Sequence, residues 1–124
     1  MINDKTIIRP VIKNIGTVKN KSREEKFQNM TLRPIIKLQH ELLIAFFENY
    51  ILRKKIKFSI LNTLKKQELM SNIFKNDTMF KTELRGLIIG HFTVDEFTVY
   101  QTMTADANKR ILTMIRERLL SVTL

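Results

Sequence analysis

The most apolar stretch of the chain covers residues 31–55, TLRPIIKLQHELLIAFFENYILRKK. Placed on a helix at about 100° per residue, its apolar positions surround most of the circumference, and Lys37, Glu41 and Glu48 form the only polar strip. A helix of this kind is either buried in a fold or spans a membrane. No membrane span is expected, because charges interrupt the run before about 20 apolar residues have accumulated. The pattern predicts a long buried axial helix over residues 32–55.

Residues typical of helix N-caps stand before the apolar helical periods of the chain. They are Ser22, Thr31, Asn62, Asp77 and Thr93. Thr93 and Glu96 have the spacing of a capping box, and the amphipathic pattern after them predicts a long C-terminal helix over residues 94–121, with a kink near Thr104. Together these periods predict an all-α fold, a small bundle of about four to five helices around the axial helix.

The N-terminal residues 1–21 differ from the rest of the chain. Pro10 is incompatible with a helix interior, and Gly16 interrupts the apolar pattern that follows. We therefore expect a loosely ordered arm over residues 1–21 and a single helical domain over residues 22–124. Such an arm packs either on its own domain or on a partner subunit.

The helix expected from Thr78 to about His91 carries small residues at four-residue spacing, Thr82, Gly86 and Gly90. A glycine inside a helix costs about 0.5–1 kcal/mol relative to alanine. Gly86 is therefore expected to mark the close approach of another helix, and Gly90 to end its own helix.

The formal net charge is +10, and its densest cluster is the basic patch of Arg53, Lys54, Lys55 and Lys57 at the end of the axial helix. Such a patch attracts nucleic acid or anionic surfaces, but basic residues at a helix C-terminus also suit the helix dipole. Because no groove-reading motif accompanies the charge, nucleic acid is the weakest of the partners considered.

Cysteine is absent, which excludes disulfides and thiolate metal sites. The N-terminal residues contain no continuous apolar segment of the secretory type. A cytoplasmic location is therefore expected.

The sequence contains none of the common nucleotide-binding, hydrolase or metalloprotease motifs, so no catalytic residue and no cofactor are predicted. His40 and His91 are weak candidates for a metal site, since nothing in their spacing brings them together. Glu41, Glu48 and Glu83 fit solvated helix faces better than acid–base catalysis.

Four residues are candidates for close packing or for an interface between chains. They are Phe47, Gly86, Asn108 and Arg118. Asn108 and Arg118 lie on or beside the apolar stripe of the last helix, where a polar residue can fix the register of a helical seam. Alternatively, both lie at the edge of the stripe and reach water. The axial helix has more apolar circumference than one short chain covers easily, which favours a homodimer or larger assembly.

Three segments carry a resemblance to a known group of proteins. They are FQNMTLRPIIKLQ (27–39), GLIIGHFTVDEFTVY (86–100) and NKRILTMIRERL (108–119). Over residues 24–120 the chain resembles a group of small all-helical bacterial proteins that carry the label "glyoxalase". The resemblance implies an all-helical chain of unknown role. It brings no site with it, because this chain has neither the strands nor the metal ligands of the true glyoxalases.

Three functions follow from these observations. The favoured one is a non-catalytic helical interaction protein that associates with itself or with another protein. The alternative is a glyoxalase-class lyase, as the label of the resembling group suggests. The weaker alternative is a basic nucleic-acid-binding module.

Overall fold

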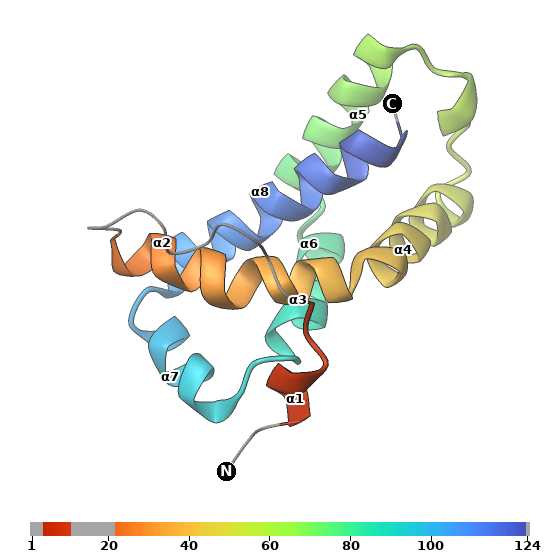
Figure 1. Ribbon diagram of the computed structural model, residues 1–124. Coiled ribbons are helices and arrows are strands. Elements are labelled where there is room, and N and C mark those ends of the chain that lie inside the picture. Colours follow the sequence, from red (N-terminus) through yellow and green to blue (C-terminus); the bar gives the residue numbers. More distant parts are fainter. Residues whose placement is uncertain (1–3, 11–21, 124) are drawn as a thin grey trace.

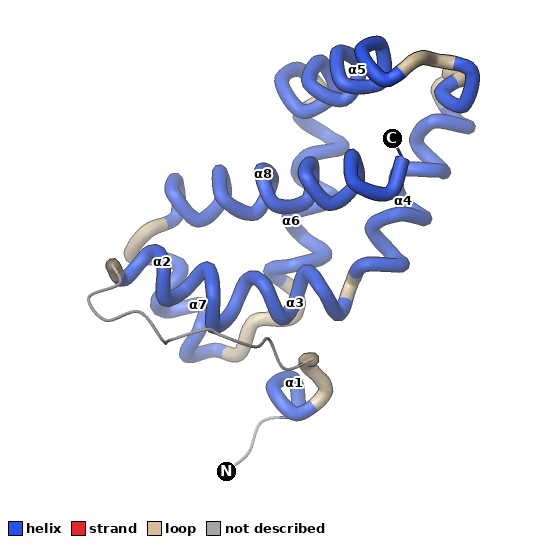
Figure 2. Tube along the Cα trace, turned by 45° about the horizontal axis from the view of Figure 1, so that its top comes forward, coloured by secondary structure: helices blue, strands red, loops and turns tan. Residues whose placement is uncertain are grey.

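The computed structural model describes residues 4–10 and 22–123, and every regular element within these ranges is helical (Figures 1 and 2). The elements are α1 (Asp4–Ile7), α2 (Arg23–Phe27), the π-helical turn η1 (Gln28–Leu32), α3 (Arg33–Leu38), α4 (His40–Arg53), the 3₁₀ turn η2 (Phe58–Ile60), α5 (Thr63–Asn76), α6 (Thr78–Ile89), α7 (Val94–Gln101) and α8 (Thr104–Thr123). The predicted all-α class is confirmed. Of the predicted arm, residues 1–3 and 11–21, including Gly16, lie outside the described residues.

The segments α2, η1 and α3 form one continuous helical rod, which Figure 1 shows in orange. Ser22 caps it as expected, because its hydroxyl accepts a hydrogen bond from the Glu25 N–H at 3.1 Å. Thr31 is not a cap but a buried residue within the π turn. Its following turn contains Pro34, which lacks an N–H and crowds the preceding turn. The wider π turn, in which the Arg33 N–H donates to the Gln28 carbonyl, makes room for this proline.

The prediction of one axial helix over residues 32–55 is wrong, because the backbone breaks at Gln39. Gln39 has φ −90° and ψ 9°, outside the helical region, and α4 leaves α3 at an angle (Figure 1). The Gln39 side chain donates to the Leu87 carbonyl at 3.1 Å, which ties the break to the end of α6. The bend lets α3 and α4 cover different parts of the core, and it leaves one side of α4 in solvent.

The helix on which the others pack is α8 rather than the predicted axial helix. It contacts η1, α4, α5, α6 and α7. Its inward stripe contains Ile111, Ile115 and Leu119, all of which are fully buried. Full burial of a side chain of this size contributes roughly 1.5–3 kcal/mol, so this stripe is the centre of the core.

The C-terminal region forms two helices where the sequence predicted one with a kink near Thr104. The break lies at Thr102 and Met103, between α7 and α8. The Thr102 hydroxyl donates to the Val99 carbonyl at 2.6 Å, and the Thr104 hydroxyl donates to the Tyr100 carbonyl at 3.3 Å. Such side-chain bonds compete with the helical ladder and favour a turn. Met103 is buried at this turn.

The caps predicted for the middle helices are confirmed. Asn62 Oδ1 accepts from the Lys65 N–H at 2.8 Å, and Asp77 Oδ1 accepts from the Phe80 N–H at 3.0 Å. Asp77 also accepts a hydrogen bond from the Tyr50 hydroxyl at 2.7 Å, which joins α4 to the start of α6. Burial and this hydrogen bond raise the pKa of Tyr50 to about 12. Hydrogen bonds from Tyr50 and from the Phe80 N–H lower the pKa of Asp77.

The predicted close helix contact at Gly86 is wrong. Gly86 is exposed, and a Cβ built on it has no atom of another element within 4 Å. Gly90 does end α6, and a Cβ there would lie 3.1 Å from the Gly86 carbonyl oxygen. The spacing of small residues on α6 therefore reflects no packed helix.

We expect Gly86→Ala to raise the free energy of unfolding by about 0.5–1 kcal/mol, because alanine is the better helix former and meets open space here. Urea denaturation measures the change. Gly90→Ala is the matched control and is expected to give no such gain. A less stable Gly86→Ala protein would mean that another helix does lie against this position.

Candidate functional site

Two basic side chains of the N-terminal arm, those of Lys5 and Arg9, attach its described part to the segment that follows α6. Lys5 Nζ donates to the Phe92 carbonyl at 2.9 Å, and Arg9 Nη2 donates to the His91 carbonyl at 2.6 Å. Both carbonyls belong to the segment between α6 and α7, whereas the last-turn carbonyls of α6 accept from Gln39 and from the N–H groups that follow the helix. The arm thus ties down this connecting segment from a distant part of the sequence.

Glu96 connects this arm to the start of α7. Its carboxylate accepts hydrogen bonds from Arg9 at 2.6 and 2.8 Å and from the Thr93 N–H at 2.8 Å, completing the predicted capping box. Burial acts to raise the pKa of Glu96, but the hydrogen bonds from Arg9 and Thr93 outweigh it and hold the pKa below its usual value. The charged form of Glu96 is therefore part of the folded structure.

His91 belongs to this docking contact. Its carbonyl accepts from Arg9, while its Nδ1 is buried and has no hydrogen-bond partner within residues 4–10 and 22–123. Arg9 Nε is also buried and has no hydrogen-bond partner within these residues. Buried polar atoms of this kind are ordinarily satisfied by water.

His40 lies elsewhere, at the start of α4, against Arg118 of α8. Arg118 Nη1 and His40 Nδ1 are 3.0 Å apart. Arginine only donates, so His40 accepts through Nδ1 and carries its proton on Nε2. The two histidines therefore have separate partners, and the described residues contain no group of three or more His, Cys, Asp or Glu that could hold a metal ion.

The other candidate residues also have partners within the chain. Asn108 accepts a hydrogen bond from the Tyr100 hydroxyl across the α7–α8 turn. Phe47 is 2% exposed and packs edge-on against Phe58, with ring centroids 5.2 Å apart. Phe47 is thus a core residue of its own chain, and Asn108 and Arg118 each have a polar partner there.

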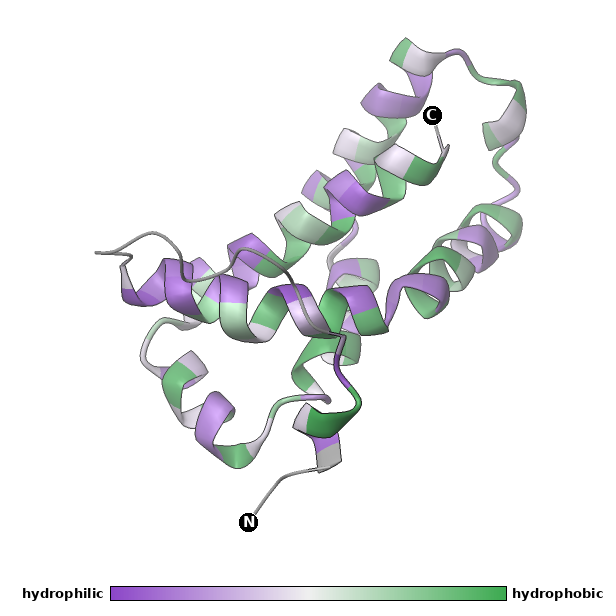
Figure 3. Cartoon of the chain, in the orientation of Figure 1, coloured by the Kyte–Doolittle hydropathy of each residue, from purple (hydrophilic) through white to green (hydrophobic). Residues whose placement is uncertain are grey.

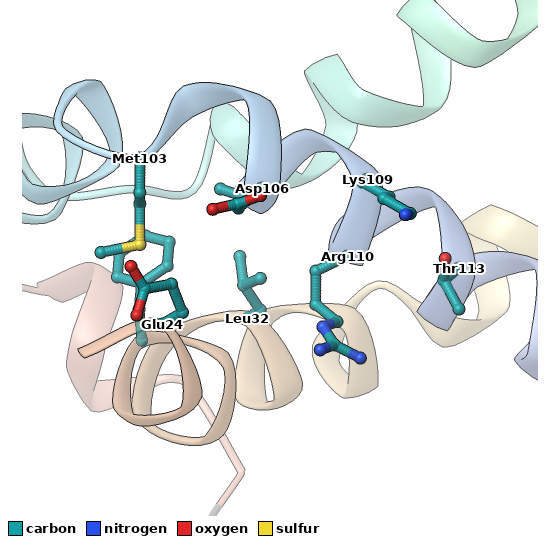
Figure 4. A pocket seen from close by; sticks show the side chains of 9 residues that line it. Glu24, Leu32, Met103, Asp106, Lys109, Arg110 and Thr113 are labelled. Atoms are coloured by element: carbon teal, nitrogen blue, oxygen red, sulfur yellow. The ribbon is translucent and has the colours of Figure 1, made fainter. Parts of the chain in front are cut away.

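A hollow of about 480 Å³ lies between the rod and α8 (Figure 4). Glu24 and Met103 lie at one end of it, and Arg110 and Thr113 at the other. Its acidic and basic side chains, including Glu24 and Arg110, belong to exposed residues. Solvated charges of both signs without a histidine do not define a catalytic arrangement.

A second hollow, of about 460 Å³, adjoins the first and is lined by Arg33, Arg110 and Arg118. Three arginines suit an anion. Two of them are already engaged, however: Arg33 Nε donates to Asn29 at 2.9 Å, and Arg118 contacts His40. Glu117 also lines this hollow, and its carboxylate would repel a bound anion.

The predicted basic patch lies at one end of the molecule, where the chain passes from α4 through the linker to the start of α5 (Figure 1). We call residues 52–66 the basic tip. Its charged residues are Arg53, Lys54, Lys55, Lys57, Lys65 and Lys66, and it contains no Asp or Glu. The sequence prediction missed Lys65 and Lys66 in the first turn of α5, although Lys66 lines the same hollow as Leu52 and Lys57.

Apolar side chains are exposed within the basic tip. Ile60 is 76% exposed and Leu64 is 61% exposed. Ile60 borders a third hollow, of about 600 Å³, whose walls include Ile51, Ile56 and Phe58. Figure 3 shows hydrophilic and hydrophobic residues alternating along this linker. The tip therefore combines positive charge with accessible apolar surface.

The end of α4 adds a strained lysine to the tip. Lys55 has φ 57°, a left-handed conformation that glycine usually adopts at this position. The Ile56 N–H donates to the Ile51 carbonyl and the Lys55 N–H donates to the Leu52 carbonyl, which is the hydrogen-bond pattern of a Schellman motif. A non-glycine residue here costs about 1 kcal/mol or more, so the lysine charge is present despite a local penalty.

The outward face of α4 is the second surface with exposed apolar groups. Leu42, Ala45, Asn49 and Leu52 follow one another at steps of three and four residues, and all four are exposed. Leu42 is 42% and Leu52 is 77% exposed. These residues lie opposite the buried face of α4. They are the part of the predicted all-round apolar surface that the chain leaves uncovered.

Comparison of the chain with family models, with curated proteins and with solved structures gives no match. Candidate functions therefore depend on this chain's own residues. Within the described ranges, no helix is long and apolar enough to cross a membrane.

We expect Arg9→Ala to lower the free energy of unfolding at neutral pH by about 2–4 kcal/mol, because it leaves the half-buried Glu96 carboxylate without its main partner. Urea denaturation measures the loss. Arg23→Ala, which removes an exposed arginine, is the control and should change stability by less than about 0.5 kcal/mol.

The effect of Arg9→Ala should depend on pH. The folded pKa of Glu96 is lowered, so the stability that its ionised form contributes is complete above the ordinary value of 4.5 and is lost as the pH falls through the lower folded pKa. We expect the stability gap between wild type and Arg9→Ala to narrow as the pH falls below 4.5. A gap that stays constant down to about pH 2 would exclude this role for Glu96.

Proposed function

We propose that the chain is a non-catalytic helical protein that associates with itself through the outward face of α4. The observation that supports this proposal is the exposed stripe of Leu42, Ala45, Asn49 and Leu52. Its spacing of three, four and three residues is that of a coiled-coil seam.

The stripe is complementary to itself in the antiparallel direction. When two copies of α4 pair about a twofold axis at the level of residue 47, positions symmetric about that residue share a layer. Leu42 of one copy then shares a layer with Leu52 of the other, and Ala45 with Asn49. The acidic Glu41 end of each helix lies at the level of the basic end of the other, and the helix dipoles are antiparallel.

The stripe is only one helix wide and contains the polar Asn49. Small interfaces of this kind are weak, so we expect a dissociation constant of about 10–100 μM. The residues proposed to mediate self-association therefore differ from those that the sequence predicted. Phe47 is buried within its own chain, Arg118 pairs with His40, and the exposed residues of α4 take their place.

A glyoxalase-class lyase remains a prediction of the resemblance alone. None of the three hollows combines a histidine with carboxylates in its lining, so no geometry of this chain favours it as a second candidate. An assay with methylglyoxal and glutathione tests it directly.

We expect Ala45→Glu and Leu42→Glu each to abolish self-association, because a charge on the seam is buried without a partner when two copies pair. Sedimentation equilibrium at up to about 200 μM measures the effect. Met79→Glu is the matched control, since Met79 is 72% exposed on α6 and lies outside the seam. A wild-type chain that is monomeric over this concentration range would contradict the proposal.

The antiparallel direction can be tested separately. Glu48 lies one residue from the proposed axis, so the two copies of Glu48 fall on the same flank and repel each other. We expect Glu48→Gln to strengthen association about twofold. In a parallel pair, Glu48 would instead face the opposite flank of the other helix. Weaker or unchanged association of Glu48→Gln would exclude the antiparallel arrangement.

A further inference from the structure

The basic tip carries most of the excess positive charge of the molecule. Residues 52–66 contain six basic and no acidic residues, whereas the whole chain has 22 basic and 12 acidic residues. Five of the six basic residues are lysines, which act as flexible point charges rather than as planar forks. Such a surface attracts anions through its field more than through a defined geometry.

The exposed apolar side chains of the tip indicate which kind of anionic partner suits it. Ile60 and Leu64 are mostly exposed, and Ile60 borders the hollow of about 600 Å³ whose walls include Ile51, Ile56 and Phe58. A nucleic-acid backbone gains nothing from exposed aliphatic side chains. A bilayer surface offers both a layer of anionic headgroups and apolar acyl chains beneath it.

Four of the six basic residues of the tip are restrained by their own backbone or by neighbouring groups. Lys55 stands in the left-handed position at the end of α4 in spite of its cost. Arg53 and Lys54 lie over the Tyr50 ring, at 5.9 and 5.8 Å from its centroid. Lys66 donates to the Thr123 carbonyl at 2.9 Å, which fixes the end of α8 beside the tip. The only acidic residue in the lining of the hollow is Glu48.

We propose that the basic tip binds the surface of bilayers that contain anionic phospholipids, with its lysines among the headgroups and Ile60 and Leu64 inserted at the acyl boundary. A neighbouring copy of this chain is a poorer occupant, because two tips carry the same sign of charge. Leu52 belongs to both surfaces, but neither Ile60 nor Leu64 belongs to the α4 seam, so variants of these two residues test membrane binding separately from self-association.

Sedimentation with vesicles tests this inference on the full chain. We expect the protein to bind vesicles of phosphatidylcholine with about 30 mol% phosphatidylglycerol and not vesicles of phosphatidylcholine alone. Raising the salt concentration to about 0.5 M should weaken binding, because it screens the lysines. Failure to bind the anionic vesicles, or equal binding to both kinds, overturns the proposal.

Two variants separate the charged and apolar contributions. Lys54→Glu/Lys57→Glu should reduce binding to anionic vesicles at least about 30-fold. Ile60→Ser/Leu64→Ser should reduce it about tenfold or more, because two apolar side chains no longer insert. The controls make the same chemical changes elsewhere. They are Lys26→Glu/Lys37→Glu and Met79→Ser/Val94→Ser, all at exposed positions. Circular dichroism confirms that each variant is folded.

The remaining outcomes are also decisive. Full binding by Ile60→Ser/Leu64→Ser would mean that the tip recognises polyanions without inserting, and equal losses in the controls would mean that no particular surface is used. Short duplex DNA or RNA that binds more tightly than anionic vesicles would assign the tip to nucleic acid. Each of these results overturns the proposal. Ala45→Glu, measured in parallel, shows whether self-association fails while vesicle binding persists.

Discussion

The structure depends above all on burying the apolar stripe of α8. Ile111, Ile115 and Leu119 are fully buried, and η1, α4, α5, α6 and α7 all contact this one helix. A helix with a single apolar stripe normally packs against a surface on one side. Here, short helices with breaks between them surround that stripe, because a straight neighbour would cover only part of it. The breaks at Gln39 and at Thr102–Met103 separate these short helices and let α4 and α7 approach α8 in their own directions.

The ends of these short helices create a second requirement, since each end exposes backbone groups without helical partners. At four helix starts an N-cap side chain accepts a hydrogen bond from one of these backbone groups. The caps are Ser22, Asn62, Asp77 and Thr93. The segment after α6 is held from a distance, because Lys5 and Arg9 bind the carbonyls of Phe92 and His91. Because Arg9 also binds Glu96, one side chain joins the arm, the end of α6 and the start of α7.

What the sequence could predict follows from the range of the interactions involved. The helical class and the caps depend on neighbours within four residues, so the pattern specifies them. The Arg9–Glu96 pair joins residues 87 positions apart, and no local pattern indicates it. The axial helix was mispredicted because hydrophobicity alone does not show that Gln39 would break it. The close contact predicted at Gly86 was wrong for a similar reason. The spacing of small residues indicates packing only when a second helix lies against them, and the sequence does not show whether one does.

The candidate surfaces also combine features that the sequence shows locally with features that only the fold brings together. The basic cluster after Leu52 is visible in the sequence, but its extension to Lys66 depends on the turn between α4 and α5, which brings Lys66 to the same hollow as Leu52 and Lys57. A cluster of like charges on such a turn repels itself, and Lys55 adds the cost of a left-handed backbone. Glycine at position 55 and acidic residues at the start of α5 would remove both penalties and improve the local structure. Because the chain contains neither change, local stability does not account for this charge, which is the reason for proposing an anionic partner at the tip. The α4 stripe is nearly uncharged at its centre, and it is instead the surface that we propose contacts a second copy.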